Sequence, residues 1–188
     1  MKSAINCPYY YYSGALSEGV CNLIIEEGLK LTARAASLDQ GATKDDKMRK
    51  GLISFFPENT WIEKLVIDYV ASASKEANWN YVITGKEQLQ FANYKKEAFY
   101  DWHRDCNITS DLYRKLSVTV QLSDSEDYEG GELQFKNYWG NMTLINPKDM
   151  LKRGTVIVFP SSILHQVTPI TRGTRYSLVQ WYNGPDFV

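Results

Sequence analysis

The sequence predicts a mainly β protein, in which a jelly-roll or barrel of short strands is braced by two N-terminal helices. From residue 81 onward, strand-like runs recur every 8–15 residues, and turn clusters such as 129–131 and 172–174 separate them. The apolar spacing of amphipathic helices is confined to the first 80 residues. Eight or nine short strands in succession favour a jelly-roll or barrel over a parallel sheet.

The first predicted helix lies near the N-terminus and is followed by a polar segment. Ser17 followed by Glu18 is typical of a helix start, and apolar residues at helical spacing predict a helix over 17–37. Residues 38–50 are polar and without periodicity, so they predict a loop. A long polar loop of this kind is a candidate lid over a bound substrate.

A strand and a second helix come next. Residues 52–56 predict a short strand that Pro57 closes, and a helix begins near Asn59 or Thr60 with its apolar residues on one face. We expect the two helices to brace the outer face of the larger sheet. Further strands are predicted at 81–84, 88–94, 99–106, 116–122, 132–136, 141–145, 155–159, 164–168 and 174–182.

Composition and charge indicate one soluble domain over 1–188, with a helical support over about 1–80 and a strand core over about 81–188. The net charge is −1, so no basic field would draw the chain to nucleic acid or to an anionic membrane. The three cysteines lack C-x-x-C spacing, which favours a reducing cytoplasm over a disulfide framework. We expect no signal peptide and no membrane span. The sequence carries no signal for an oligomeric state.

The two histidines of the chain stand in patterns that suit a metal site. His103 opens an H-x-D triplet with Asp105, and residues two apart on a strand project from the same face. His165, from a distant predicted strand, would complete a set of two imidazoles and one carboxylate. That set leaves three coordination positions open and is used by non-haem Fe(II) oxygenases. An ordinary structural histidine is the alternative at either position, but coincidence explains both positions poorly.

The last predicted strand offers a face that suits a carboxylate. Arg175, Ser177, Val179 and Trp181 alternate along it and therefore share one face. A guanidinium pairs bidentately with a carboxylate, so Arg175 and Ser177 could grip the far carboxylate of a dicarboxylic cosubstrate. Arg172 precedes a turn glycine and is expected to be solvated. An exposed strand arginine is the alternative for Arg175.

These residues carry a family resemblance. The chain resembles the iron(II)/2-oxoglutarate dioxygenases of the prolyl 4-hydroxylase-like group, especially the compact bacterial and phage PKHD-type hydroxylases. The resemblance runs from about Phe91 to Tyr182, roughly half of the chain. Its carriers, in order, are Tyr94 with YDWHRD at 100–105, LSVTVQLS at 116–123, DYEGGEL at 127–133, RGTVIVFP at 153–160 and HQVTPITRGTR at 165–175.

The resemblance implies a double-stranded β-helix core in which His103, Asp105 and His165 ligate Fe(II). It also implies that O2 and 2-oxoglutarate are consumed, that an unactivated C–H is hydroxylated, and that succinate and CO2 are released. Ascorbate supports many members of the family by reducing the iron again. The expected acceptor is a proline residue, free or in a peptide or protein. Another amino acid or a small metabolite is the alternative.

The resemblance further implies a cosubstrate site. Arg175 would bind the 5-carboxylate of 2-oxoglutarate, with Ser177 as a helper. Tyr94 matches a tyrosine that lines this site in the group, and Trp181 fits an indole that closes the pocket in some relatives. Gln121 stands where certain prolyl hydroxylases place a tyrosine that contacts the cosubstrate.

The chain departs from the group's usual pattern, Y-x-x-G-x-x-Y-x-x-H-x-D, at one position. Glu97 stands where the pattern has glycine, a residue that permits a tight turn or a close approach. A carboxylate there is expected to alter substrate selection.

Three other functions stay open. An AlkB-like nucleic-acid demethylase is disfavoured by the near-neutral charge. A cupin-like binding module without activity would not need the three metal-binding side chains together with Arg175. A zinc hydrolase built on His103, Asp105 and His165 would leave Arg175 and Ser177 unexplained.

Overall fold

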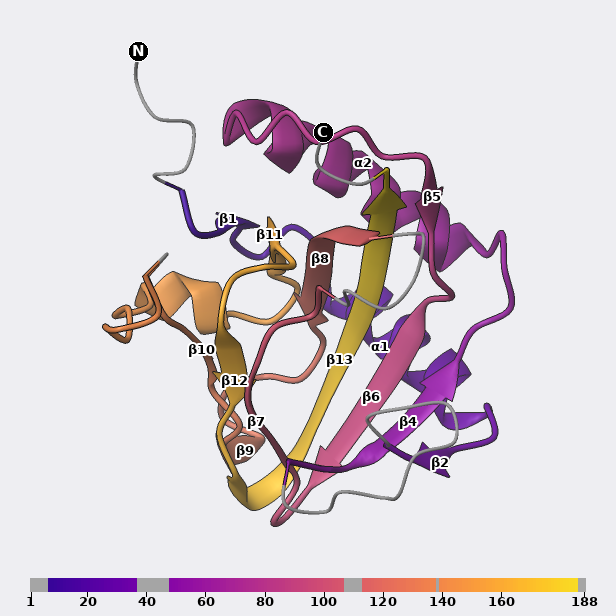
Figure 1. Ribbon diagram of the computed structural model, residues 1–188. Coiled ribbons are helices and arrows are strands. Elements are labelled where there is room, and N and C mark those ends of the chain that lie inside the picture. The colour runs from indigo at the N-terminus through magenta and orange to yellow at the C-terminus, as the bar shows by residue number, and fades with distance from the viewer. Residues whose placement is uncertain (1–6, 37–47, 107–112, 138, 186–188) are drawn as a thin grey trace.

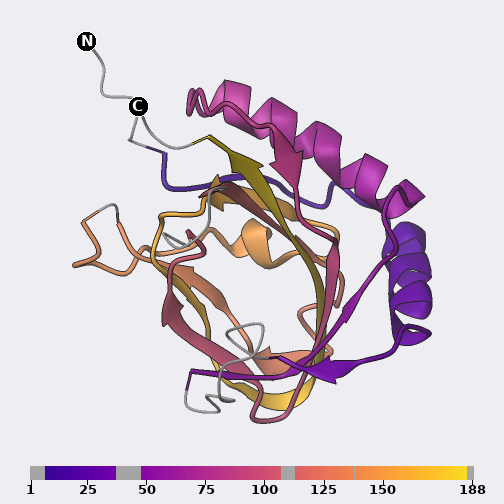
Figure 2. The same ribbon diagram turned by 45° about the vertical axis from the view of Figure 1, so that its right-hand side comes forward.

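Two antiparallel sheets face each other in this protein, and two helices cover the outside of the larger sheet, as Figure 1 and Figure 2 show. A computed structural model describes residues 7–36, 48–106, 113–137 and 139–185. The larger sheet has nine strands and the smaller has four. The predicted class, mainly β with N-terminal helices, is therefore confirmed.

The larger sheet is built around its longest strand, β13. Its order is β1 (Tyr10–Tyr12), β11 (Val156–Pro160), β8 (Tyr113–Gln121), β13 (Ile170–Gly184), β6 (Gln90–Lys95), β4 (Leu52–Phe55) and β2 (Arg34–Ala35), with β5 (Gly85–Lys86) and β9 (Tyr128–Gly130) also paired to β13. The smaller sheet has the order β10 (Leu133–Phe135), β12 (His165–Val167), β7 (Phe99–His103) and β3 (Arg49–Lys50). The helices are α1 (Glu18–Leu29), α2 (Trp61–Glu76) and the short 3-10 helix η1 (Lys148–Leu151).

Both α-helices begin near the predicted positions, α1 after Ser17 and α2 after Thr60, the second of the two alternatives Asn59 and Thr60. The Ser17 side chain accepts the N–H of Val20 at 3.4 Å, and the Thr60 side chain accepts the N–H of Glu63 at 3.3 Å. Side-chain caps of this kind satisfy N–H groups that a helix start leaves without partners. Neither α1 nor α2, the α-helices in the described ranges, is long and apolar enough to cross a membrane.

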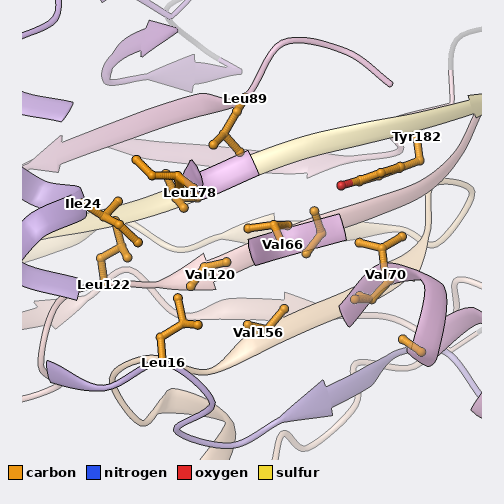
Figure 3. Close-up of a cluster of buried hydrophobic side chains, with 14 of the residues drawn as sticks. Leu16, Ile24, Val66, Val70, Leu89, Val120, Leu122, Val156, Leu178 and Tyr182 are labelled. Atoms are coloured by element: carbon orange, nitrogen blue, oxygen red, sulfur yellow. The ribbon is translucent and has the colours of Figure 1, made fainter. Parts of the chain in front are cut away.

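The main core lies between these helices and the larger sheet (Figure 3). Val66 of α2 and Ile24 of α1 pack with Val120, Val156 and Leu178 of the sheet, and all five side chains are at most 1% exposed. Burying a side chain of this size contributes about 1.5–3 kcal/mol. The prediction that the helices brace the outer face of the larger sheet is confirmed.

The first helix is shorter than the prediction of 17–37. It ends at Leu29, because the N–H groups of Lys30 and Leu31 turn back to the carbonyls of Glu27 and Gly28, each at 3.2 Å. Leu31 still packs against the core, but from the loop after the helix. The apolar residue at position 31 therefore indicated burial and not helical structure.

Two predicted strands do not form. Residues 81–84 lie outside any strand, and pairing with β13 begins at β5. Residues 141–145 contribute a single bridge, between Lys136 and Thr143. The side-chain oxygen of Asn137 accepts the N–H of Asn141 at 3.1 Å, which closes this stretch into a turn. Asparagine bonds of this kind compete with strand pairing.

The predicted loop over 38–50 ends in a strand. Arg49 and Lys50 form β3, which pairs with Tyr100 and Phe99 of β7. Residues 38–47, and with them most of the predicted lid, lie outside the described residues. The short strands β1, β2 and β9 were not predicted either, since runs of two or three residues carry little periodicity.

Candidate active site

The two histidines and Asp105 meet between the sheets. His103 ends β7, His165 begins β12, and the two residues are direct partners across these strands. The predicted strand 99–106 stops at His103, because the N–H of Asp105 donates to the Ser161 carbonyl at 2.9 Å. Asp105 nevertheless points its carboxylate at both imidazoles, as the H-x-D spacing predicted.

The three side chains present one ligand atom each to a common point. Nε2 of His103 lies 3.4 Å from Oδ1 of Asp105, and Nε2 of His165 lies 3.5 Å from Oδ2. All three ligand atoms are within 4.8 Å of one another. Neighbouring ligands about 2.1 Å from an octahedral metal are about 3 Å apart, so the two contacts to Asp105, at 3.4 and 3.5 Å, are close to the spacing around one cation.

Hydrogen bonds to backbone carbonyls fix the tautomers of both imidazoles. Nδ1 of His103 lies 2.7 Å from the Asp101 carbonyl oxygen, and Nδ1 of His165 lies 2.9 Å from that of Ile163. A carbonyl only accepts, so each Nδ1 carries the proton and each Nε2 keeps its lone pair. The lone pairs therefore face Asp105, where a metal would bind.

The protonation states also suit a cation. Burial lowers the pKa of His165 to about 4, so its imidazole is neutral at pH 7. Burial would raise the pKa of Asp105, but His165, His103 and the Ser117 hydroxyl outweigh it and hold that pKa below its usual range. A neutral imidazole at His165 and an ionised carboxylate at Asp105 are the forms of these side chains that bind metals.

Arg175 is a buried cation that lacks a carboxylate partner within the described part of the chain. Its side chain donates from Nη2 to Gln121 Oε1 at 2.7 Å and from Nη1 to Ser177 Oγ at 3.2 Å, while Nε has no acceptor among the described residues. A buried charge without a counter-ion is costly, and a bound carboxylate would remove that cost. The residues present therefore fit a carboxylate ligand at this point.

One narrow pocket, of about 50 Å³, collects most of the predicted site residues. Its lining includes His103, Asp105, His165, Tyr94, Arg175, Ser177 and Trp181. Gln121 is absent from this lining and lies behind Arg175, whose guanidinium it holds. Arg172 ion-pairs with Glu129 at 2.8 Å and its side chain is 60% exposed, so the expectation that it is solvated is confirmed.

A wider cavity, of about 610 Å³, lies near β3 and the turn between β6 and β7. It shares Arg49 with the narrow pocket, and the described residues that line it include neither histidine nor aspartate. We place the candidate site in the narrow pocket, because ligand geometry and an unpaired buried cation coincide there.

Sequence reasoning missed two residues that line the pocket, Arg49 and Tyr100, and one that supports Asp105 from behind, Ser117. Arg49 donates from Nε to the Tyr94 hydroxyl at 3.2 Å, and its guanidinium lies 4.5 Å above the Tyr100 ring. That ring stacks on His103 with 3.4 Å between centroids. The Ser117 hydroxyl donates to Asp105 Oδ2 at 2.7 Å. The inward alternation along the β8 strand could have pointed to Ser117, whereas nothing in the polar segment around Arg49 indicated a buried strand.

The backbone conformation at Glu97 explains why the family pattern has glycine at this position. Its φ angle is 68°, in the left-handed region that favours glycine. The strained turn is held by the Glu97 N–H, which donates to the Ile170 carbonyl at 2.8 Å, and by an ion pair between its carboxylate and Lys50 at 2.6 Å. The carboxylate thus points to β3, outside the pocket lining.

Comparison with known proteins assigns the family. Residues 89–183, half of the chain, match the family model of the 2OG-Fe(II) oxygenase superfamily. The chain belongs to this superfamily. The matched region of this 2OG-Fe(II) oxygenase contains His103, Asp105, His165 and Arg175.

Curated relatives are similar over the same region. A PKHD-type hydroxylase of Alteromonas mediterranea is 38% identical over 97 residues, and PKHD-type hydroxylase YbiX of Escherichia coli is 35% identical over 96. Each match covers 48% of this chain, and 41% and 40% of the respective relative. The chain therefore matches less than half the length of these relatives.

Solved structures share the fold over nearly the whole chain. A prolyl-4-hydroxylase of Pseudomonas putida superposes with a TM-score of 0.71 at 18% identity, covering 96% of this chain and 95% of that one. A prolyl hydroxylase of Trichoplax adhaerens, solved with a peptide fragment of hypoxia inducible factor, gives 0.69 at 19% identity, covering 94% and 84%. The double-stranded β-helix core expected from the sequence is thereby confirmed.

Proposed function

We propose that this 2OG-Fe(II) oxygenase hydroxylates a proline residue of a peptide or protein, with conversion of 2-oxoglutarate and O2 to succinate and CO2. The observation that carries the proposal is the coincidence of an imidazole–carboxylate triad with an unpaired buried guanidinium in one pocket. The buried guanidinium is not required by a zinc hydrolase or by a binding module without activity.

The roles follow from the side-chain geometry. His103, Asp105 and His165 would hold Fe(II), which supplies the oxidative chemistry when it is bound. Arg175 would pair with the far carboxylate of 2-oxoglutarate, and Gln121 and Ser177 keep its guanidinium in place. Binding of the far carboxylate by Arg175 would hold the 2-oxo acid end of the cosubstrate next to the metal, which lowers the entropic cost of bringing the two together.

The remaining side chains of the pocket wall would orient the bound ligand and shield it from water. Tyr94 is held by Arg49, and the Tyr100 ring covers one face of the His103 imidazole. The Nε1–H of Trp181 at the pocket has no acceptor in the part of the chain that the structure describes, so it could donate to a bound ligand. Burial of this wall excludes water, which strengthens the pairing of Arg175 with an anion.

The proline and peptide parts of the proposal rest on similarity. Both the curated relatives and the solved structures include hydroxylases, and the Trichoplax enzyme is named as a complex with a peptide fragment. The similarity covers the strands around the pocket more closely than the N-terminal helices.

The test has two stages. Anaerobic addition of Fe(II) and then 2-oxoglutarate should produce the visible charge-transfer band of a chelated 2-oxo acid, and His165→Ala should abolish it. Air is then admitted with ascorbate and a panel of proline peptides and free amino acids. Succinate and a product heavier by one oxygen atom on a prolyl residue are the expected results. Oxygen gained on another amino acid alone would reject the proline assignment while preserving the chemistry.

A further inference from the structure

Two buried serines stand behind the carboxylate of Asp105. The Ser117 hydroxyl lies 2.7 Å from Asp105 Oδ2 and 2.9 Å from the hydroxyl of Ser161. Both serines are fully buried, with no exposed surface. The carboxylate itself is 5% exposed. Water therefore has little access to this row of oxygen atoms.

The direction of the hydrogen bonds is fixed by proton count. An ionised carboxylate only accepts, so the single proton of the Ser117 hydroxyl goes to Asp105. Ser117 must then accept from Ser161 in the second bond. A donor that itself accepts a hydrogen bond is a stronger donor, so Ser161 reinforces the hold of Ser117 on Asp105.

Ser161 also connects the segment that contains Asp105 with the turn that precedes His165. The Ser161 carbonyl accepts the backbone N–H groups of Asp105 and Cys106, at 2.9 and 3.1 Å. Ser161 lies four residues before His165, in the turn between β11 and β12. It therefore holds Asp105 through the main chain directly and through the side chain by way of Ser117.

We propose that Ser161 and Ser117 form a hydroxyl relay that positions the Asp105 carboxylate for metal binding. Neither serine touches the metal position, so both are positioning residues. The inference rests on the proposed function, since it assigns Asp105 to a metal. Partners that orient metal ligands typically contribute about 10–100-fold to metal affinity.

The relay is tested by metal affinity and not by turnover. Mn(II), which does not undergo the oxidative reaction, is titrated into the metal-free protein, and free Mn(II) is measured by electron paramagnetic resonance. Ser117→Ala should raise the dissociation constant about 10–100-fold. Ser117→Thr keeps a hydroxyl and should restore most of the affinity. Ser54→Ala removes another buried serine hydroxyl, on β4 and away from the site, and should leave the affinity unchanged.

A double-mutant cycle separates a relay from a structural effect. Ser161→Ala alone should weaken Mn(II) binding about 3–10-fold, but should add less than about twofold when Ser117 is already alanine. The melting temperature of each metal-free variant is compared with that of Ser54→Ala to establish folding. If Ser117→Ala misfolds, Ser161→Ala still tests the relay, and unchanged affinity in that variant overturns it.

The outcomes distinguish this proposal from the proposed function. Folded Ser117→Ala that binds Mn(II) within about threefold of wild type overturns the relay and leaves the metal site standing. Equal effects of Ser161→Ala in both backgrounds overturn the order of the bonds. A wild-type protein that binds no Mn(II), Fe(II) or other divalent cation would instead overturn the proposed metal site itself.

Discussion

Replacing Arg175 with methionine should separate ligand binding from folding. Arg175 is 3% exposed, so its pairing with a carboxylate is little screened by water. Removing one partner of a buried charge pair costs about 2–5 kcal/mol, which corresponds to a rise of about 30-fold to 4,000-fold in the dissociation constant of 2-oxoglutarate. The lower part of that range is expected, because Arg49 lines the same pocket and keeps it positive.

Arg175→Met should have a much smaller effect on the stability of the ligand-free protein than on ligand binding. Methionine is close to arginine in length but carries no charge, so the variant loses an unpaired buried cation. It also loses the hydrogen bonds to Gln121 and Ser177. These two changes oppose each other, and replacing buried charges by apolar groups is often neutral or stabilising. The melting temperature without ligand should therefore change little.

Thermal denaturation with and without 2-oxoglutarate, in the presence of Mn(II), measures both effects. At about 100 times its dissociation constant the ligand stabilises the wild type by about 2.7 kcal/mol, and the same concentration should stabilise Arg175→Met by less than about 1 kcal/mol. Arg172→Ala is the control, since that side chain is 60% exposed. Equal losses in both variants, or undiminished stabilisation of Arg175→Met, would refute the assignment of Arg175.

Three further predictions concern pH, the core and the turn at Glu97. The metal-free protein should lose on the order of 3 kcal/mol of stability as the pH falls from 6.5 to 4, because the pKa of His165 is lowered from 6.5 to about 4 by burial and the unfolded chain takes up the proton first. Urea denaturation across this range should show the slope, and His165→Gln should flatten it. Leu116→Ala empties a fully buried core position and should cost about 2–5 kcal/mol in the same assay, so a loss under about 1 kcal/mol would contradict the packing. Glu97→Gly should raise the melting temperature, since relief of the left-handed backbone outweighs an exposed ion pair with Lys50, and a lower melting temperature would contradict this balance.

The predictable part of the fold is the part with strong periodicity. The long strands β8 and β13 and the starts of both helices lie near their predicted positions, because alternation and hydroxyl caps are local signals. Segments of two or three residues, such as β2 and β3, exist only because a longer strand is available to pair with them. Local sequence does not encode that partner, so these strands could not be predicted.

The candidate site also has residues that could be predicted from the sequence and residues that could not. His103, Asp105, His165 and Arg175 could be selected from the sequence, because metal and carboxylate chemistry restricts the residue types that serve them. The groups that hold them in place are ordinary residue types. Serine at position 161 has no distinctive local pattern, and its role depends on two strands that meet only in the folded chain.

The alternation along β13 divides its side chains between two surroundings. Leu178 and Tyr182 point to the core packed under the helices, whereas Arg175, Val179 and Trp181 point to the pocket. Substitutions on the pocket face of this stretch leave the core packing in place, because the two faces share no side chain. A change of size at Val179 would therefore reshape the pocket wall while Leu178 and Tyr182 preserve the scaffold.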